Sequence, residues 1–388
     1  MPPLRSFASL SSSTGRQYSV FDFPELGNGL LAPWDMSLEG AQRDPVFTIQ
    51  RTKFACSAVA IGMRLSHVVS GAGGFLGLYQ VLAEIYRATD TAHGRRIELT
   101  SPPYLQPFMV THMLHMNSDQ RIKALSERPA AYSVRDPKAA ESSTGTGSHS
   151  QQESSKSDPL VGRSLRFSSS AIATLKSQAV DPENSSARTS AFTALSAHFW
   201  QHTHLARLAQ IQSGSNEGQQ QIFSSSVFGT SVDFVPHLGL APRSFGNIVV
   251  TPVVKLDSKE LAQASLWKIA DIINGHIRHV FAEETHKLGS WIAAQATKSH
   301  IQLDFPWIAN SFIATGWHRF PLYSGADLDV APIFASPVLM ECLFDGMIVF
   351  VESKAKDGGL EAIASMKRST WESPDKDEKF INTWGRRS

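Results

Sequence analysis

The chain is most informative at Ile61-Gly62-Met63-Arg64-Leu65-Ser66-His67-Val68-Val69-Ser70-Gly71-Ala72-Gly73-Gly74-Phe75. Apolar side chains alternate from Val59 up to His67, and this period of two predicts a half-buried strand. After the glycines, apolar residues recur at helical spacing from Phe75 to Ile85 and predict a helix whose last turn holds Arg87. The pattern therefore places a histidine at a strand end and beside a helix start, where catalytic groups are often mounted.

A histidine in this place can act as a general base. Imidazole titrates close to physiological pH, so its neutral form can accept a proton from an attacking hydroxyl or amine. A histidine on an apolar face can equally be a hydrogen-bonded core residue, and only its surroundings decide between the two. We take His67 as the candidate catalytic residue.

The glycines of this stretch allow a second interpretation. Gly71, Gly74 and Gly77 form a GxxGxxG pattern between a predicted strand and a predicted helix, as in dinucleotide-binding dehydrogenases of the extended type. Glycines there would let a pyrophosphate approach the helix N-terminus. The pattern lies far from the N-terminus, however, and neither regular βαβ units nor a Tyr-x-x-x-Lys pair accompanies it. A nucleotide-binding oxidoreductase is therefore a minor alternative.

Bulk composition limits the class of protein. The 388 residues, 42% hydrophobic and 18% charged, can bury the core of one large or two ordinary domains. The net charge of +1 provides no global field for nucleic acid or an anionic membrane surface. The two cysteines, Cys56 and Cys342, suggest neither a disulfide framework nor a thiolate metal site, which favours a reducing, cytoplasmic location. No apolar run reaches the roughly 18 residues of a membrane span, so a soluble protein is expected. We also expect it to be a monomer.

The middle of the chain changes in composition. Residues 134–159 are rich in Ser, Thr, Gly, Gln and charge, and cannot bury enough apolar surface to offset the entropy of ordering them. We therefore expect an N-terminal domain at 1–135, a flexible crossover linker at 136–159 and a C-terminal domain at 160–388. The first sixteen residues have arginine and serine but no acid, which loosely resembles an organelle transit peptide without its amphipathic period.

Strands and helices are mixed in both halves, which predicts an α/β or α+β fold. Leu160–Phe167 is expected to be a strand, and the serines after it can cap a helix. A longer helix is predicted from Ser190. The short apolar runs Ile248–Val250 and Met347–Val351 suit buried strands.

Three histidines on the predicted helix are candidate metal ligands. His198 and His202 lie one helical turn apart, a spacing that zinc can use, and His204 follows them. No glutamate completes an HExxH pattern, and the neighbouring Phe199 and Trp200 favour a packed helix. No metal is expected.

Several segments taken together resemble the BAHD-type acyl-CoA-dependent acyltransferases, the HxxxD transferases, in a branch like those of fungi. They occur in the family's order over most of the chain, and the set comprises Pro45–Cys56, the His67 turn with its helix, Thr193–Trp200, Arg243-Ser244-Phe245-Gly246-Asn247, Thr315–Tyr323 and Lys356–Glu361.

The resemblance implies two domains of the chloramphenicol-acetyltransferase-like kind, with mixed sheets flanked by helices and an active-site channel between them. His67 matches the histidine of the HxxxD motif, which takes the acceptor's proton as the acceptor attacks the thioester. Thr315 and Trp317 match a Thr-x-Trp segment that faces the channel in relatives, where Thr can orient the acceptor and the indole N–H can stabilise an oxyanion. Acyl-CoA is implied as co-substrate, with no bound cofactor.

The chain departs from the family pattern in three places. The motif aspartate falls at Gly71, and Val235 stands where its arginine partner is expected, so a buried pair is lost jointly, which a fold can tolerate. The family's DFGWG segment is replaced by Ala326-Asp327-Leu328-Asp329-Val330-Ala331. A strand and helix that usually precede Pro45 are also absent, as expected for a shortened or divergent member.

These observations predict an acyltransferase that moves an acyl group from acyl-CoA to a hydroxyl or amine of a small, secondary-metabolite-like acceptor, with His67 as general base. Such a protein needs neither nucleic acid nor membrane as a partner. Gly71 keeps open the alternative of a non-catalytic binding protein with this fold. Acyl chain length, acceptor and transfer to oxygen or nitrogen depend on the shape of the pocket.

Overall fold

The computed structural model describes most of the chain. The described residues are 18–35, 37–92, 96–105, 116–129, 131–135, 158–184, 188–213, 223–235, 238–241, 243–279, 283–305, 308–325, 327–338 and 340–372. The predicted crossover at 136–159, apart from its last two residues, and the predicted transit-like segment lie outside them.

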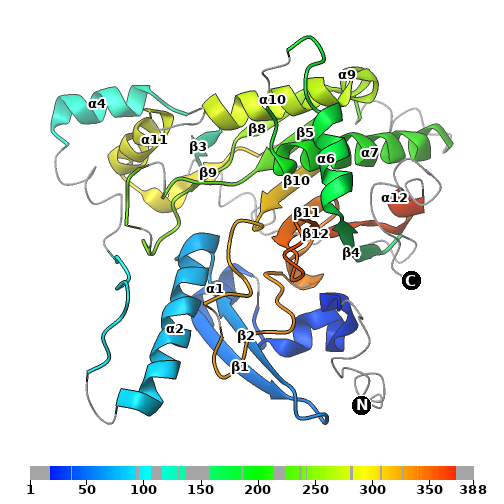
Figure 1. The fold of residues 1–388 in the computed structure, drawn as a ribbon. Coiled ribbons are helices and arrows are strands. Elements are labelled where there is room, and N and C mark those ends of the chain that lie inside the picture. Colours follow the sequence, from blue (N-terminus) through cyan, green and yellow to red (C-terminus); the bar gives the residue numbers. More distant parts are fainter. Residues whose placement is uncertain are drawn as a thin grey trace.

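Strands and helices alternate along these residues (Figure 1). The strands are β1 (Phe47–Lys53), β2 (Val59–Leu65), β3 (Tyr132–Val134), β4 (Leu160–Phe167), β5 (Ser225–Thr230), β6 (Val232–Asp233), β7 (Val249–Val250), β8 (Val253–Asp257), β9 (Ile301–Leu303), β10 (Ser311–Gly316), β11 (Met347–Glu352) and β12 (Leu360–Lys367). The helices are α1 (Leu38–Arg43), α2 (Ala72–Ala92), α4 (Ser118–Ser126), α6 (Ser169–Gln178), α7 (Ala191–Ser213), α9 (Ser258–Gln263), α10 (Leu266–His279), α11 (Glu283–Ala294) and α12 (Arg368–Glu372), and short 3₁₀ turns are η2 (Val20–Asp22), η3 (Pro24–Leu30), η4 (Lys298–His300) and η5 (Met340–Cys342).

A six-stranded mixed sheet organises the C-terminal half, with the order β4-β12-β11-β10-β5-β8. The central strands β5, β10 and β11 run parallel, and the outer pairs are antiparallel. The run Met347-Ile348-Val349-Phe350-Val351 forms most of β11, as its apolar sequence predicts for a strand covered on both faces.

The two faces of this sheet pack against different layers. Ile348 and Phe350 face a large core to which α6, α7, α9, α10 and α12 contribute. Val349 and Val351 alternate with them and face a second, smaller cluster. Leu76 from α2 belongs to that second cluster, so the helix after the His67 turn packs onto the sheet.

The N-terminal half contributes a hairpin of β1 and β2 beside α2 (Figure 1). The prediction of β2 is confirmed, but the strand ends at Leu65, two residues before His67. The most buried side chain of the strand is Arg64, not one of the alternating apolar residues. The cause is that its face packs against earlier residues: Arg64 lies 4.7 Å over the Trp34 ring and donates to the Pro45 carbonyl.

The helix predicted after the glycines is also confirmed, and α2 continues five residues beyond Arg87. Its most buried residues are Leu76, Val81 and Ala83, whereas Ile85, which the periodicity places inside, is 37% exposed. The first turn lies at the sheet and the last turn far from it (Figure 1). Only the N-terminal part of α2 is therefore close to the sheet.

Other predicted elements agree with the structure. β4 has the predicted bounds, and Ser168 caps α6 by accepting from the Ala171 backbone N–H at 3.1 Å. The predicted helix after Ser190 is α7, and Ile248–Val250 yields the short β7. The predicted α/β fold class is confirmed. Among the described residues, no helix has the length and apolar character that crossing a bilayer requires.

The elements before the crossover do not all lie beside α2. β3 pairs with β9 in antiparallel register, and α4 lies next to α11 (Figure 1). A chain segment before residue 136 therefore packs with elements from beyond residue 280. The division at 1–135 and 160–388 stays a prediction.

Candidate active site

His67 lies in the turn that joins β2 to α2. The turn is closed by the Val69 N–H, which donates to the Ser66 carbonyl at 3.0 Å. The Ser66 N–H donates to the carbonyl of Val46, the residue before β1, at 2.9 Å. The His67 side chain is exposed. The imidazole is thus held outside the strand ladder and is accessible to solvent.

A loop from the C-terminal half meets this turn. The Gly71 N–H donates to the Gly246 carbonyl at 3.0 Å, and the Ser70 hydroxyl lies 3.4 Å from the same oxygen. The side-chain amide of Asn247 donates to the His67 carbonyl at 2.8 Å. The turn is therefore bonded at both ends to residues about 180 positions later in the chain.

The glycines at the start of α2 serve close packing. A Cβ at Gly74 would lie 2.1 Å from Ser70 Oγ, and one at Gly71 would lie 3.0 Å from Val249 Cγ2. A Cβ at Gly77 would meet nothing within 4 Å. Because the Gly71 N–H already bonds to Gly246, it is not available to a pyrophosphate. The protein's own packing accounts for two glycines of the dinucleotide-like pattern.

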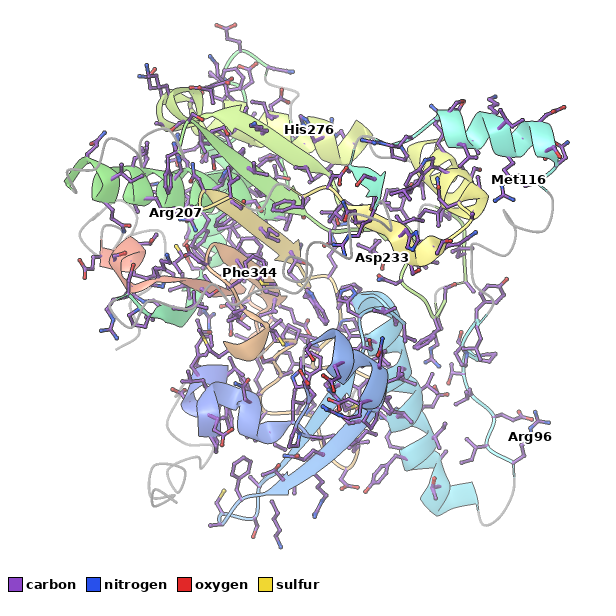
Figure 2. All side chains as sticks on the ribbon, turned by 180° about the vertical axis from the view of Figure 1, so that it is seen from behind. Arg96, Met116, Arg207, Asp233, His276 and Phe344 are labelled. Atoms are coloured by element: carbon purple, nitrogen blue, oxygen red, sulfur yellow. The ribbon has the colours of Figure 1, made fainter. Side chains whose placement is uncertain are left out.

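A carboxylate from the β6–β7 ribbon lies at the N-terminus of α2. A Cβ at Gly73 would lie 2.7 Å from Asp233 Oδ2, and Figure 2 shows Asp233 near the start of the helix. Asp233 Oδ1 accepts from the Val235 N–H at 2.9 Å. A negative charge beside the first turn is stabilised by the partial positive charge of the helix end. The ribbon therefore places a carboxylate beside the start of α2, although position 71 has none.

Thr315 lies on the sheet face that the N-terminal end of α2 meets. It pairs with Val349 across the parallel strands β10 and β11, and paired residues point to the same face. Val349 belongs to the cluster that contains Leu76 of α2, whereas Ala314 faces the opposite core. The structure thus puts Thr315 and the first turns of α2 in the same layer.

Trp317 follows the end of β10 and is half-buried in this layer. Its backbone N–H donates to the Phe350 carbonyl at 2.7 Å. Its ring lies edge-on to the Phe320 ring, with the ring centroids 5.7 Å apart. Phe320 in turn lies 3.6 Å from a Cβ built on Gly73. A chain of contacts therefore links the Thr-x-Trp segment to the residues that follow the His67 turn.

His318 is a polar side chain with an unusual environment. Its ring stacks on Phe192 at 6.2 Å, and within the described part of the chain its buried Nδ1 has no hydrogen-bond partner. Burial, assisted by the neighbouring Arg319, lowers the pKa of His318 to about 4. At neutral pH this imidazole is uncharged beside Trp317.

The segment in place of the family's DFGWG motif docks on α2. Asp327 lies 3.5 Å from the Arg87 guanidinium, and Asp329 accepts from the Tyr86 hydroxyl at 3.0 Å. These contacts are partly exposed, so each contributes little to stability. They nevertheless join this loop to the same helix that follows the His67 turn.

The three histidines of α7 lie in two different environments. His198 and His202 have ring centroids 4.4 Å apart, and His204 bonds to Asn310 and Ser258. Burial and, secondarily, His202 lower the pKa of His198. Over the residues that the structure describes, no group of three or more His, Cys, Asp or Glu could hold an ion.

The amino-acid sequence alone does not point to two residues of this region. Asn247 occurs in the segment Arg243–Asn247, which matches the family, but the sequence gives no hint that its amide reaches the His67 turn. His318 directly follows Trp317, and only the structure shows that its ring is partly buried and that its Nδ1 atom is inaccessible. Both contacts are long-range and have no periodic signal.

The fold and the matched segments agree with comparisons to known proteins. A family model described as the Transferase family matches residues 24–380. The curated BAHD acyltransferase DCR of Arabidopsis thaliana is 28% identical over 181 residues, which are 46% of this chain and 32% of that relative. The aligned part thus spans about a third of the relative's length.

Solved structures share the architecture. TRI101 of F. graminearum, complexed with coenzyme A and deoxynivalenol, has a TM-score of 0.57 at 18% identity, over 90% of this chain and 72% of that chain. Vinorine synthase has a TM-score of 0.54 at 15% identity, over 87% and 66%. The fold is therefore that of the chloramphenicol-acetyltransferase-like transferases. The chain belongs to the Transferase family of BAHD-type proteins.

Proposed function

We propose that this protein transfers an acyl group from acyl-CoA to a hydroxyl or amine of a small acceptor. The observation that carries the proposal is that the first turns of α2, which directly follow the exposed His67 turn, pack in the same layer as Trp317. Family membership supplies the reaction class. Acyl-CoA and the acceptor are the proposed partners of a cytoplasmic monomer.

In the proposed reaction, His67 accepts the proton of the acceptor's hydroxyl or amine while the oxygen or nitrogen attacks the thioester carbonyl. A new C–O or C–N bond forms, the C–S bond breaks and the proton passes to the departing CoA thiolate. Thr315 orients the acceptor, and the Trp317 indole N–H stabilises the oxyanion. Thiolate is a good leaving group, so no covalent acyl-enzyme is needed.

A non-catalytic binding protein is the second candidate, because Gly71 stands in place of the motif aspartate. Val249 and Asn247 fill the space around Gly71. Packing at this position therefore does not distinguish an active acyltransferase from a non-catalytic binding protein. The two candidates differ in turnover and share ligand binding.

The test is to measure CoA thiol release from acetyl-CoA and longer acyl-CoAs with a panel of alcohols and amines, together with acyl-CoA binding by calorimetry. Deoxynivalenol belongs in the panel because the F. graminearum structure holds it. Release above that of the His67→Gln variant supports the acyltransferase. Binding without release for every pair supports the non-catalytic protein, and absence of both contradicts both candidates.

A further inference from the structure

Building on the proposed acyltransferase, we infer that Asn247 is a positioning residue that sets the orientation of His67. Its amide donates to the backbone carbonyl of His67 at 2.8 Å. That carbonyl belongs to the peptide plane next to the His67 Cα, so fixing it restricts the direction in which the imidazole leaves the backbone. Asn247 acts through the turn and does not itself touch substrate.

The loop that carries Asn247 has a second contact with the turn. Gly246 supplies the carbonyl that accepts from the Gly71 N–H at 3.0 Å and lies 3.4 Å from the Ser70 hydroxyl. Adjacent residues of the loop therefore hold the two ends of the turn, with His67 at one end and Gly71 at the other. Two anchors define the orientation of a short segment better than one.

The opposite end of the loop is fixed to the N-terminal half. The Arg243 guanidinium lies 3.0 Å from the Glu84 carboxylate of α2 and donates to the Ser101 carbonyl at 2.6 Å. Tyr104 adds two backbone bonds, accepting from the Phe245 N–H at 2.8 Å and donating to the Arg243 carbonyl at 2.9 Å. The loop is thus braced between α2 and the His67 turn, and Asn247 is its contact with the base.

The hydrogen bond from Asn247 to the His67 carbonyl is exposed to solvent. Its effect on the orientation of His67 can therefore be measured separately from its effect on the stability of the fold. Water can replace an exposed donor, so loss of the amide changes the folded population little. Water does not hold the peptide plane in one orientation, however, and catalysis is sensitive to small misplacements of the reacting groups. Loss of the amide should therefore impair turnover more than folding.

The test compares Asn247→Ala with Ser244→Ala. Ser244 lies in the same loop and is buried, and its hydroxyl donates to the Ala241 carbonyl at 2.7 Å, away from the turn. With acetyl-CoA and the best acceptor of the panel, kcat of Asn247→Ala should fall about 10- to 100-fold. The KM for acetyl-CoA and the melting temperature should stay near the wild-type values. Ser244→Ala should keep its kcat and lower the melting temperature more.

A second measurement does not need turnover. The imidazole resonances of His67, assigned by their disappearance in His67→Gln, should shift in Asn247→Ala and keep their positions in Ser244→Ala. A wild-type kcat in Asn247→Ala, equal losses of kcat in both variants, or unmoved His67 resonances would each overturn the inference. If the wild type itself releases no CoA with any acceptor, the proposed acyltransferase fails, and the resonances alone still decide the role of Asn247.

Discussion

Gly71 and Val249 are in such close contact that a Cβ on the glycine would lie 3.0 Å from the valine Cγ2. The carbonyl oxygen of the Asn247 side chain would lie 3.3 Å from the same Cβ. Position 71 is buried, and its neighbours are an apolar methyl group and an oxygen. A carboxylate placed there would meet no positive charge from these neighbours.

Restoring the motif aspartate alone should therefore destabilise the protein. Gly71→Asp adds steric strain and an unpaired buried charge, for which a loss of about 3 to 5 kcal/mol is expected. Urea unfolding followed by circular dichroism measures this loss. An unchanged or raised stability of Gly71→Asp would contradict the expectation.

Gly77→Ala, in the helix that begins directly after Gly71, is the matched control. A Cβ there meets nothing within 4 Å, and alanine has a better helix propensity than glycine. We expect Gly77→Ala to raise the free energy of unfolding by up to about 1 kcal/mol. A loss of stability comparable to that of Gly71→Asp would show that all substitutions in this part of α2 are harmful.

His67→Ala should abolish turnover and leave the fold intact. The side chain is exposed, so its removal creates no cavity, whereas loss of a general base costs about 10²- to 10⁴-fold in rate. Steady-state CoA release and a thermal melt of the same sample measure both effects. Activity retained in the variant would rule out His67 as the base.

Trp317→Phe should lower kcat about 10²- to 10³-fold, the usual cost of losing one oxyanion donor. The phenyl ring can keep the edge-on contact with Phe320, so the melting temperature should change little. The comparison variant is Phe320→Leu, which removes that contact and retains the indole N–H. If Phe320→Leu slows turnover as much as Trp317→Phe, the indole acts through packing.

Acid should destabilise the protein partly through His318. Its pKa in the folded state is about 4, below the value of 6.5 for a free side chain, so only the unfolded chain takes up the proton between these values. Stability is therefore full above about pH 6.5 and falls as the pH drops toward about 4, by at most about 1.4 kcal/mol per pH unit. His318→Phe should reduce the difference between urea unfolding curves at about pH 7 and pH 5.

Other buried histidines contribute to acid sensitivity in the same direction. Burial also lowers the pKa values of His198 and His204, so the His318→Phe variant keeps part of the pH dependence. A His318→Phe curve that runs parallel to the wild-type curve over this range would show that His318 is not held neutral.

Local elements could be predicted from the sequence because their signals are local. The bounds of β4 follow from its apolar run, and the N-cap of α6 follows from the serines that come directly after β4. The alternation of apolar residues correctly predicted the position of β2. It predicted the wrong buried face, because Arg64 is the buried residue of the strand. Arg64 is inside because Trp34 and Pro45 cover that side, and no pattern within the strand reveals residues that arrive from elsewhere in the chain.

The candidate site could be predicted only in part. His67 follows from its place between a strand and a glycine-rich turn, and Thr315 with Trp317 follows only from the family resemblance. The contact of Asn247 with the turn joins positions 180 residues apart. The burial of His318 depends on Phe192 from another element. Such contacts depend on tertiary packing, which composition and periodicity do not encode.

Helix α2 is attached to the C-terminal half along its length. Glu84 forms an ion pair with Arg243, and Arg87 forms one with Asp327. Directly before the first turn of the helix, the Gly71 N–H donates to the Gly246 carbonyl. The helix cannot detach from the C-terminal half as a separate body without losing all three connections. We therefore expect α2 to lose its amide protection together with β10 and β11, as one cooperative unfolding unit, while the β1–β2 hairpin exchanges sooner.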